Sequence, residues 1–317
     1  MTTHEPTTDA SLSSARRSDR GDRIFSGLAR AAGLTILVSL AAVFVFLLLQ
    51  GLDGFHADRQ YYEPSASGFL GYVLKLLFGT ALAAVIAMVI AVPFAVGVAL
   101  FLSHYAPRRL ATPIAYVIDL LAAVPSVVFG LWGARTLAGL SQPFQAWLNH
   151  HLGWLPFFSG EVSATGRTIL VAGVVLAIMV LPITTAICRE VFARTPRLNE
   201  EAALALGATR WETIRYAVFP HARSGMIAGM MLGLGRALGE TMAVTMVLSA
   251  GGPLMTWQII TSNNPATIAS NIAARFNGED VGIQSVLLAT GLILFVFTFA
   301  VNFLARWAIA RGERKFA

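Results

Sequence analysis

The chain contains few charged residues. Charged residues occupy only 13% of its 317 positions, whereas hydrophobic residues occupy 56%. A soluble domain of this size needs more polar surface than these residues can supply. The composition therefore excludes a soluble globular protein and predicts a protein that lies in lipid.

Lysine and cysteine are nearly absent, and this excludes several kinds of site. A phosphate-binding P-loop needs a lysine after a glycine-rich turn, but neither of the two lysines, Lys75 and Lys315, follows a glycine. No His-Glu-x-x-His or Cys-x-x-Cys pattern occurs, so no metal site is expected. The single cysteine, Cys188, excludes an internal disulfide and is expected to be a packing residue. We therefore expect no catalytic residue, no metal and no cofactor bound by this chain.

Long apolar runs are what the chain has instead. Six of them approach or exceed the roughly 20 residues that a helix needs to cross a bilayer, and they lie near 28–51, 72–103, 112–139, 168–188, 224–250 and 283–308. Each must be an α-helix, because backbone groups in hydrocarbon have to be hydrogen-bonded within their own segment. The prediction is an all-α polytopic membrane protein with a six-helix domain over 23–317, preceded by a disordered tail at 1–22.

The placement of basic residues predicts the orientation of these helices. Most of the 23 Lys and Arg residues lie before the first run, between the second and third, between the fourth and fifth, and after the sixth. By the positive-inside rule, both termini and the segment 189–223 are cytoplasmic.

The segment 189–223 has internal signals of its own. Glu200 and Glu201 are suited to opening a short helix, because acidic residues favour the positive N-terminal end of the helix dipole. Gly207 can take the left-handed conformation that ends such a helix. Thr209 and Glu212 then form a capping box that starts a second helix. The pattern predicts a helix, a glycine elbow and a helix.

The second helix is expected to run to Pro220. A short, Ala-rich helix beside a glycine suits insertion into a groove on a partner, but a solvated amphipathic connector would have the same pattern. The residues by themselves do not decide between these two interpretations.

The fifth run carries small and charged residues. Gly225, Gly229 and Gly233 repeat every four residues, so they line one face of the helix and allow close approach of a neighbour, within the subunit or in another subunit. Arg236 and Glu240 lie roughly 20 Å and 26 Å from the start of this helix, where a charge is costly. They are expected to pair at i,i+4 spacing, either as an ion pair that locks the bundle or as part of an aqueous path for an anion.

Asp119 is the other acid inside an apolar run, only about 10 Å from its start. A structural partner or a hydrated cavity residue is favoured over a role in substrate binding. Pro93, Pro125 and Pro182 interrupt three of the predicted helices and are expected to kink them.

Two resemblances to known families rest on these residues. The cytoplasmic segment is similar to the Glu-Ala-Ala loop of bacterial ABC importer permeases, which it matches at Glu201, Ala202, Ala203, Gly207 and Pro220. It departs from that pattern where Ala217 and Phe219 replace an isoleucine and a leucine. In that family the loop contacts a cleft on the ATPase subunit, so the resemblance implies that Glu201, Ala202, Ala203 and Gly207 form the coupling contact.

The second resemblance concerns the substrate. The stretch 233–244, Gly-Leu-Gly-Arg-Ala-Leu-Gly-Glu-Thr-Met-Ala-Val, resembles the fifth-helix signature of phosphate importer permeases of the PstC type, and 120–130 and 291–299 resemble the same subunit. Sulfate and molybdate permeases share the Arg-Ala-Leu-Gly-Glu core but usually differ where Thr241 and Met242 stand here. The resemblance implies a type I ABC importer permease (MetI-like) fold with a substrate pathway at Arg236, Glu240 and Thr241.

The same resemblance implies a set of partners and a location. These are a second, PstA-type permease, a PstB-type ATPase dimer that uses ATP and Mg, and a periplasmic PstS-type phosphate-binding protein, all at the bacterial inner membrane. The outer segments 147–158 and 267–276 are expected to form short helices suited to contact with the binding protein. A permease for sulfate or molybdate is the alternative, and a gradient-driven channel or transporter is a weaker one.

Overall fold

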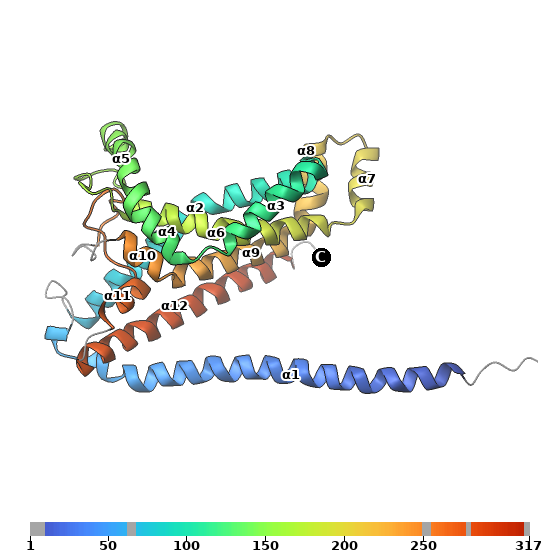
Figure 1. Ribbon diagram of the computed structural model, residues 1–317, viewed down its shortest axis with the longest axis horizontal. Coiled ribbons are helices and arrows are strands. Elements are labelled where there is room, and N and C mark those ends of the chain that lie inside the picture. Colours follow the sequence, from blue (N-terminus) through green and yellow to red (C-terminus); the bar gives the residue numbers. More distant parts are fainter. Residues whose placement is uncertain (1–9, 62–67, 249–254, 277–279, 314–317) are drawn as a thin grey trace, which may run out of the picture. The chain divides into compact units, whose positions relative to one another are not determined.

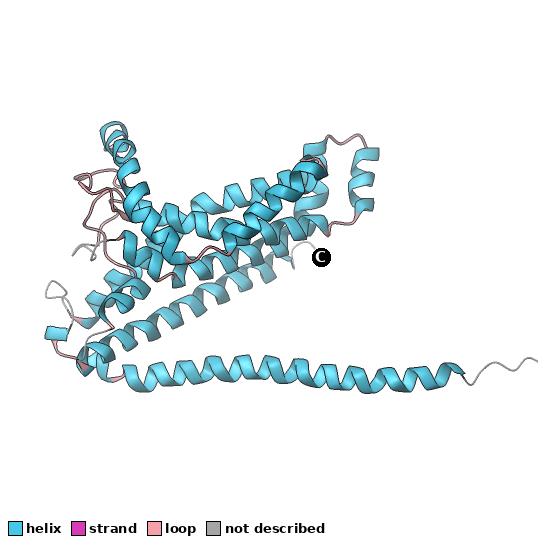
Figure 2. Ribbon diagram, viewed as in Figure 1, coloured by secondary structure: helices cyan, strands magenta, loops and turns pink. Residues whose placement is uncertain are grey.

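The structure is a computed structural model that describes residues 10–61, 68–248, 255–276 and 280–313. It divides the chain into two compact units, 1–50 and 51–317. Within the described ranges every regular element is a helix (Figure 2), so the all-α prediction is confirmed.

The first unit consists of one long helix, α1 (Ala10–Gly51). Residues 10–22 form its first turns, which corrects the prediction of a disordered tail over that range. Extending an existing helix costs far less than starting one, so the polar residues before the apolar run can continue its helix. Residues 1–9, the rest of the predicted tail, lie outside the described residues.

The centre of the second unit is the packing of α2 (Phe69–Leu100) against α6 (Ile169–Ala193) (Figure 1). Five alanines of α2 recur at every fourth position and are fully buried: Ala83, Ala87, Ala91, Ala95 and Ala99. On α6, Gly173 leaves no room for a Cβ against Ile86. Small residues on both helices therefore allow their backbones to approach closely, as in other membrane helix pairs.

The glycine face of α9 (Phe219–Gly239) packs against α6 within the same chain. A Cβ at Gly225 would lie 2.5 Å from Val191, one at Gly229 would lie 3.0 Å from Ile187, and one at Gly233 would lie 2.7 Å from Val180. These short distances leave no space for side chains at the three glycines. The sequence left open whether this face meets its own subunit or another, and the structure places it against α6.

The predicted third span is bent rather than straight. Residues 112–139 are divided between α3 (Arg108–Ala122), α4 (Ser126–Trp132), the π-helical turn η4 (Gly133–Leu137) and α5 (Ala138–Leu152). The axis turns by 91° between α3 and the continuous run from α4 through α5. Pro125 begins that run with an extended ψ of 139°. Proline has no N–H to donate and disfavours helical geometry in the residue before it, which accounts for the break.

The prolines of α2 and α6 behave differently. Pro93 and Pro182 lie inside helices that continue on both sides. Of the three prolines that were expected to interrupt helices, only Pro125 lies at a break. The π-helical turn η3 (Phe101–Tyr105) follows α2 directly.

The fifth predicted span, 224–250, is not one continuous helix, because α9 ends at Gly239. After Gly239 the chain is extended at Glu240 (ψ 125°), and a short helix, α10 (Met242–Val247), follows. Residues 249 and 250, the end of the predicted span, lie outside the described residues.

The end of the unit opposite to α7 (Arg197–Ala205) is held by polar contacts. Here η1 (Asp53–His56), η2 (Arg59–Tyr61), α11 (Ile268–Arg275) and the start of α12 (Val281–Glu313) come together. The Tyr72 hydroxyl accepts hydrogen bonds from Asn271 (2.6 Å) and Arg275 (2.9 Å). The segment 267–276 forms the expected short helix, and its capping box joins Thr267 to Ser270.

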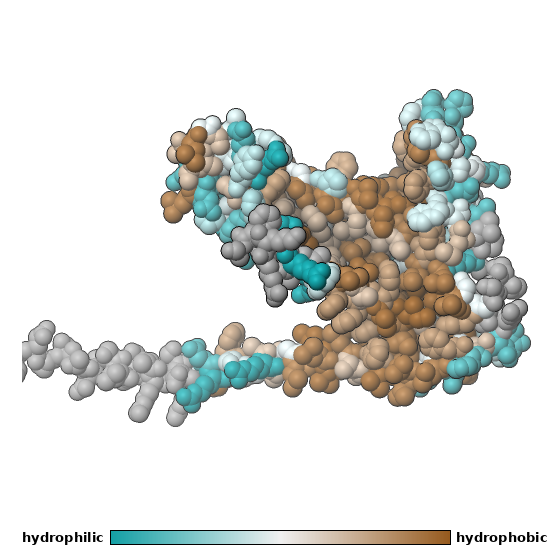
Figure 3. Space-filling model, turned by 180° about the vertical axis from the view of Figure 1, so that it is seen from behind, coloured by the Kyte–Doolittle hydropathy of each residue, from teal (hydrophilic) through white to brown (hydrophobic). Residues whose placement is uncertain are grey.

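Apolar surface covers the middle of the 51–317 unit, and hydrophilic residues gather at its two ends (Figure 3). Across the described residues, α1, α2, α6 and α12 each contain a stretch that is long and apolar enough to cross a membrane, and the bent pair of α3 with α4–α5 would add a fifth. The remaining predicted span corresponds to α9 with α10. This pattern is that of a multi-pass membrane protein.

Candidate functional site

The predicted coupling loop forms a helix, an elbow and a second helix. Its first helix, α7 (Arg197–Ala205), projects from one end of the unit together with α8 (Arg210–Thr213) (Figure 1). Gly207 has a φ of +83°, in the left-handed region that favours glycine. The Gly207 N–H donates to the Leu204 carbonyl (2.9 Å) and the Ala208 N–H donates to the Ala203 carbonyl (3.1 Å). This is the Schellman pattern of hydrogen bonds that closes the end of a helix.

The loop presents apolar side chains to solvent. Leu198 is 77% exposed and Leu206 is 90% exposed, and Glu201, Ala202 and Gly207 are also exposed. Exposed apolar side chains on a projecting segment are available for contact with another protein.

The second helix starts as predicted but does not end at Pro220. The Thr209 hydroxyl accepts from the Glu212 N–H (3.3 Å), and a Glu212 carboxylate oxygen accepts from the Thr209 N–H (2.7 Å). The Thr209 N–H and the Thr209 hydroxyl both donate to the Glu212 carboxylate, and these two hydrogen bonds hold the pKa of Glu212 below its usual value. The helix then continues through a π-helical turn, η5 (Ile214–Val218), into α9. The turn ends two residues before Pro220, whose missing N–H falls in the first turn of α9, where it costs little.

One side-chain contact ties α7 to the membrane helices. The Nε2 atom of His104, in the π-helical turn after α2, lies 3.8 Å from a Glu200 carboxylate oxygen. The Nδ1 atom of the same ring lies 2.7 Å from the Ser103 hydroxyl. Sequence reasoning did not find His104, because its partner is 96 positions away in the chain.

Arg236 and Glu240 do not form the predicted ion pair. Among the described residues, no hydrogen bond or salt bridge joins them. Because α9 ends at Gly239, Glu240 leaves the helix, and its side chain accepts from the Ala243 N–H at 3.3 Å. Glu240 therefore caps α10 instead of pairing along α9. The Nε atom of Arg236 is buried without a hydrogen-bond partner.

Thr241 lies in the break between α9 and α10. Its hydroxyl donates to the Gly239 carbonyl (3.2 Å), and its own carbonyl accepts from the Thr245 hydroxyl (2.7 Å). Thr241 thus contributes to the geometry of the break, after which Glu240 no longer belongs to the helix that carries Arg236.

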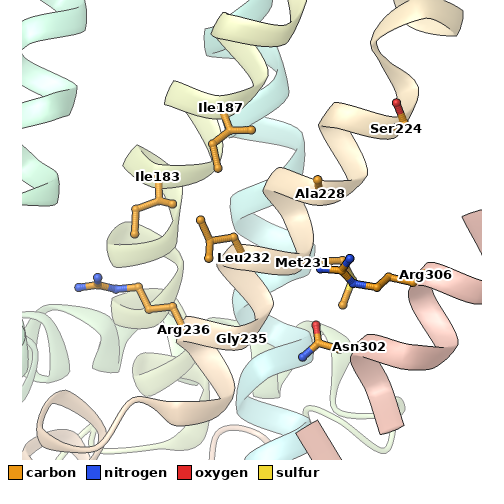
Figure 4. A pocket seen from close by; sticks show the side chains of 10 residues that line it. All are labelled: Ile183, Ile187, Ser224, Ala228, Met231, Leu232, Gly235, Arg236, Asn302 and Arg306. Carbon is orange, nitrogen blue, oxygen red and sulfur yellow. The ribbon is translucent and has the colours of Figure 1, made fainter. Parts of the chain in front are cut away.

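A groove of about 980 Å³ runs along the exposed face of α9 (Figure 4). Residues of α9 form its floor: Ser224, Ala228, Met231, Leu232, Gly235 and Arg236. Ile183 and Ile187 of α6 form one wall, and Asn302 and Arg306 of α12 form the other. The groove contains two arginines and no acidic residue, so its electrostatic potential favours an anion.

Asp119 has a partner, but it is not Arg236. A carboxylate oxygen of Asp119 lies 3.8 Å from the Arg189 guanidinium, and both side chains are partly exposed. The contact joins α3 to the end of α6, in agreement with the structural interpretation of Asp119. In the sequence, Arg189 belongs to the basic segment 189–223, which predicts orientation and gives no sign of a partner on α3.

Arg306 and Asn302 are the groove residues that sequence reasoning missed. Arg306 belongs to the basic residues near the end of the chain that predict the orientation, and no local pattern shows that α12 lies beside α9. Within the described residues, no group of His, Cys, Asp and Glu side chains could hold a metal ion.

Comparisons with known proteins agree with these features. The model of the family described as binding-protein-dependent transport system inner membrane component matches residues 91–313. The phosphate transport system permease protein PstC 2 of Mycobacterium tuberculosis is 45% identical over 321 residues, covering 98% of each chain. The phosphate transport system permease protein PstC of Xylella fastidiosa is 39% identical over 312 residues, covering 94% of each chain.

A solved structure shares the fold. A bacterial ABC transporter involved in the import of the acidic polysaccharide alginate contains a chain that aligns with a TM-score of 0.62 at 12% identity, over 94% of this chain and 98% of that one. The predicted ABC importer permease fold is therefore confirmed. Because the family model covers most of the sequence and the relatives align over nearly all of it, this chain belongs to the family of binding-protein-dependent transport system inner membrane components.

Proposed function

We propose that this chain is a permease subunit that moves inorganic phosphate across the bacterial inner membrane and is powered by a separate ATPase. The observation that carries the proposal is the groove along α9, whose only charged lining residues are Arg236 and Arg306. The relatives named as phosphate transport permeases favour phosphate among the anions that such a groove would attract. Sulfate or molybdate transport is the alternative.

The loop from α7 to α8 is proposed as the contact with the ATPase. Glu201, Ala202, Ala203 and Gly207 lie on the projecting first helix and its elbow. A rigid elbow followed by a helix that continues into α9 would transmit a movement of α7 to the groove. The contact between Glu200 and His104 supports this transmission because it connects α7 to the end of α2.

The roles of the charged residues follow from their geometry. Arg236 supplies positive charge to the path of the anion. Glu240 and Thr241 shape the break after α9, and this break frees Arg236 from an internal ion pair. A guanidinium without a fixed carboxylate can exchange one anion for the next.

The proposed complex has the partners that the family resemblance implies. They are a second, PstA-type permease, a PstB-type ATPase dimer that binds ATP and Mg, and a PstS-type phosphate-binding protein outside the membrane. This chain would bind no cofactor of its own. Both of its termini would be cytoplasmic, on the same side as α7, because basic residues are concentrated in these segments.

Uptake by the reconstituted complex tests the proposal. Proteoliposomes that contain the whole complex are supplied with binding protein, ATP and labelled phosphate, sulfate or molybdate. We expect phosphate uptake that requires both ATP and the ATPase subunit. Uptake of sulfate or molybdate in place of phosphate would assign the alternative substrate, and uptake without the ATPase would overturn the ATP-driven mechanism.

The coupling contact has its own test in Gly207. Gly207→Pro cannot adopt a φ of +83° and is expected to abolish substrate-stimulated ATP hydrolysis while the subunit remains in the membrane. Gly207→Asn is the matched control, because asparagine tolerates the left-handed region and no atom lies within 4 Å of the site of its Cβ. Normal coupling in Gly207→Pro would contradict the proposal.

A further inference from the structure

The two arginines of the α9 groove come from different helices and differ in their surroundings. Arg236 extends from α9 on the side of Ile183 and α6, whereas Arg306 extends from α12 toward Met231 (Figure 4). Met231 precedes Arg236 by five residues, or about 7 Å along α9, on the side of Ser224 and the helix start. The two cations therefore lie in sequence along the groove rather than at one point.

Arg306 has no counter-charge in the described part of the chain. It is exposed, and no salt bridge or hydrogen bond of its side chain is present there. Asn302 lies one helical turn earlier on α12 and lines the same wall. Its amide donates to the Thr298 carbonyl at 3.0 Å, which fixes the amide and leaves a second N–H free for a ligand.

A membrane-interface role accounts for Arg311 but not for Arg306. The guanidinium of Arg311 lies 3.7 Å from the centre of the Trp307 ring, an arrangement typical of residues at the membrane surface. Arg306 faces the groove instead. Anchoring of the helix end at the membrane surface does not require Arg306 to line a groove that also contains Arg236.

We infer that Arg306 and Asn302 form a second contact point for the phosphate anion, between Arg236 and the cytoplasmic end of the groove. This inference rests on the proposed function. Two weak sites in series suit a transport path, because binding must be strong enough for entry and weak enough for release. A single tight clamp by both arginines would slow release, and their separation along α9 prevents it.

A charge series at position 306 tests the inference in the reconstituted complex. A charged hydrogen bond to the anion is lost in Arg306→Gln, so we expect phosphate uptake to fall about tenfold. Arg306→Lys keeps the charge and should retain uptake within about twofold. Arg311→Gln is the matched control on the same helix and should transport as wild type. Wild-type uptake in Arg306→Gln would overturn the inference.

Cysteine chemistry separates a contact with the anion from a purely structural role. Cys188, the only native cysteine, is fully buried. A thiol reagent added on the side of the membrane where the ATPase binds should therefore modify Arg306→Cys selectively. A cationic thiol reagent should restore uptake and an anionic reagent should not. Inorganic phosphate should slow the modification, whereas chloride at equal ionic strength should not. Equal effects of both reagents, or modification that phosphate does not slow, would contradict the inference.

The same experiment distinguishes free phosphate from a lipid phosphate. The assays are run in liposomes of zwitterionic lipid and again with anionic phospholipid. Protection of position 306 by anionic lipid but not by inorganic phosphate would overturn the inference and assign the groove to a lipid headgroup. If the wild-type complex moves no phosphate at all, the proposed function fails; if only the substitutions at position 306 have no effect, the function stands and the second contact point does not.

Discussion

At the scale of single residues, the charges of the membrane region depart most from what spacing predicts. Arg236 and Glu240 have the i,i+4 spacing of an ion pair, but the helix ends between them and Glu240 caps α10. Arg236 consequently faces the groove without an acid beside it. An i,i+4 pair requires an unbroken helix, and α9 ends at Gly239, between the two residues.

Substitutions at Glu240 test this assignment. Glu240→Gln keeps an oxygen that can accept from the Ala243 N–H, so it should change the thermal stability of the purified complex little. Glu240→Ala removes the acceptor and should cost about 1 kcal/mol. If Glu240 acted through an ion pair with Arg236, the two substitutions would be equally harmful, and a double-mutant cycle with Arg236→Gln would show strong coupling.

Glu212 gives a prediction about pH. Its pKa is lowered by hydrogen bonds from the Thr209 backbone and side chain, so its carboxylate stabilises the loop above the pKa of the unfolded chain. That contribution is lost as the pH falls through the lower pKa of the folded state. Thr209→Val should raise the pKa of Glu212, and Thr209→Ser should leave it low. Carboxyl NMR of glutamate-labelled protein in nanodiscs measures it, and an unchanged pKa in Thr209→Val would contradict the role of this hydroxyl.

At the scale of elements, small residues decide which helices touch. The alanine repeat of α2 and the glycine repeat of α9 both pack against α6. α6, which leads into α7, therefore packs against both α2 and α9, the helix that carries Arg236. The glycine repeat was visible in the sequence, but the neighbour that fills it was not.

Gly233→Val is expected to destabilise the isolated subunit. Its side chain would overlap Val180 and Thr184 of α6, and overpacking of this kind costs roughly 1–3 kcal/mol. Gly97→Ala is the control, because no atom lies within 4 Å of its added Cβ. Thermal unfolding of the subunit purified alone should show a loss of stability for Gly233→Val only. A defect that appeared only on assembly with a second subunit would mean that the glycine face serves another chain.

At the scale of the whole molecule, the distribution of basic residues predicts the orientation of the chain in the membrane. Exposed residues at the two ends of the 51–317 unit allow this orientation to be tested. The exposed Leu206 lies in the elbow beside Gly207, and the exposed Trp154 lies beyond α5. In the 51–317 unit α5 and α7 lie at opposite ends (Figure 1).

Single-cysteine labelling of intact cells tests the orientation. A membrane-impermeant thiol reagent should label Trp154→Cys from outside, and it should label Leu206→Cys only after the membrane is opened. The buried Cys188 should contribute no background. Labelling of Leu206→Cys in intact cells would reverse the proposed topology.

Much of this architecture follows from local chemistry. Apolar runs, the capping box at Thr209 and the left-handed position at Gly207 depend on residues close together in the chain, so the sequence by itself determined the helical membrane fold, the elbow of the loop and its family. The bend at Pro125 was foreseen in place but not in size. Contacts between distant segments were not foreseen: Asp119 with Arg189, His104 with Glu200, and Arg306 beside α9. Only the tertiary structure decided these, because each depends on how helices pack, and packing is set by the shapes of many side chains at once.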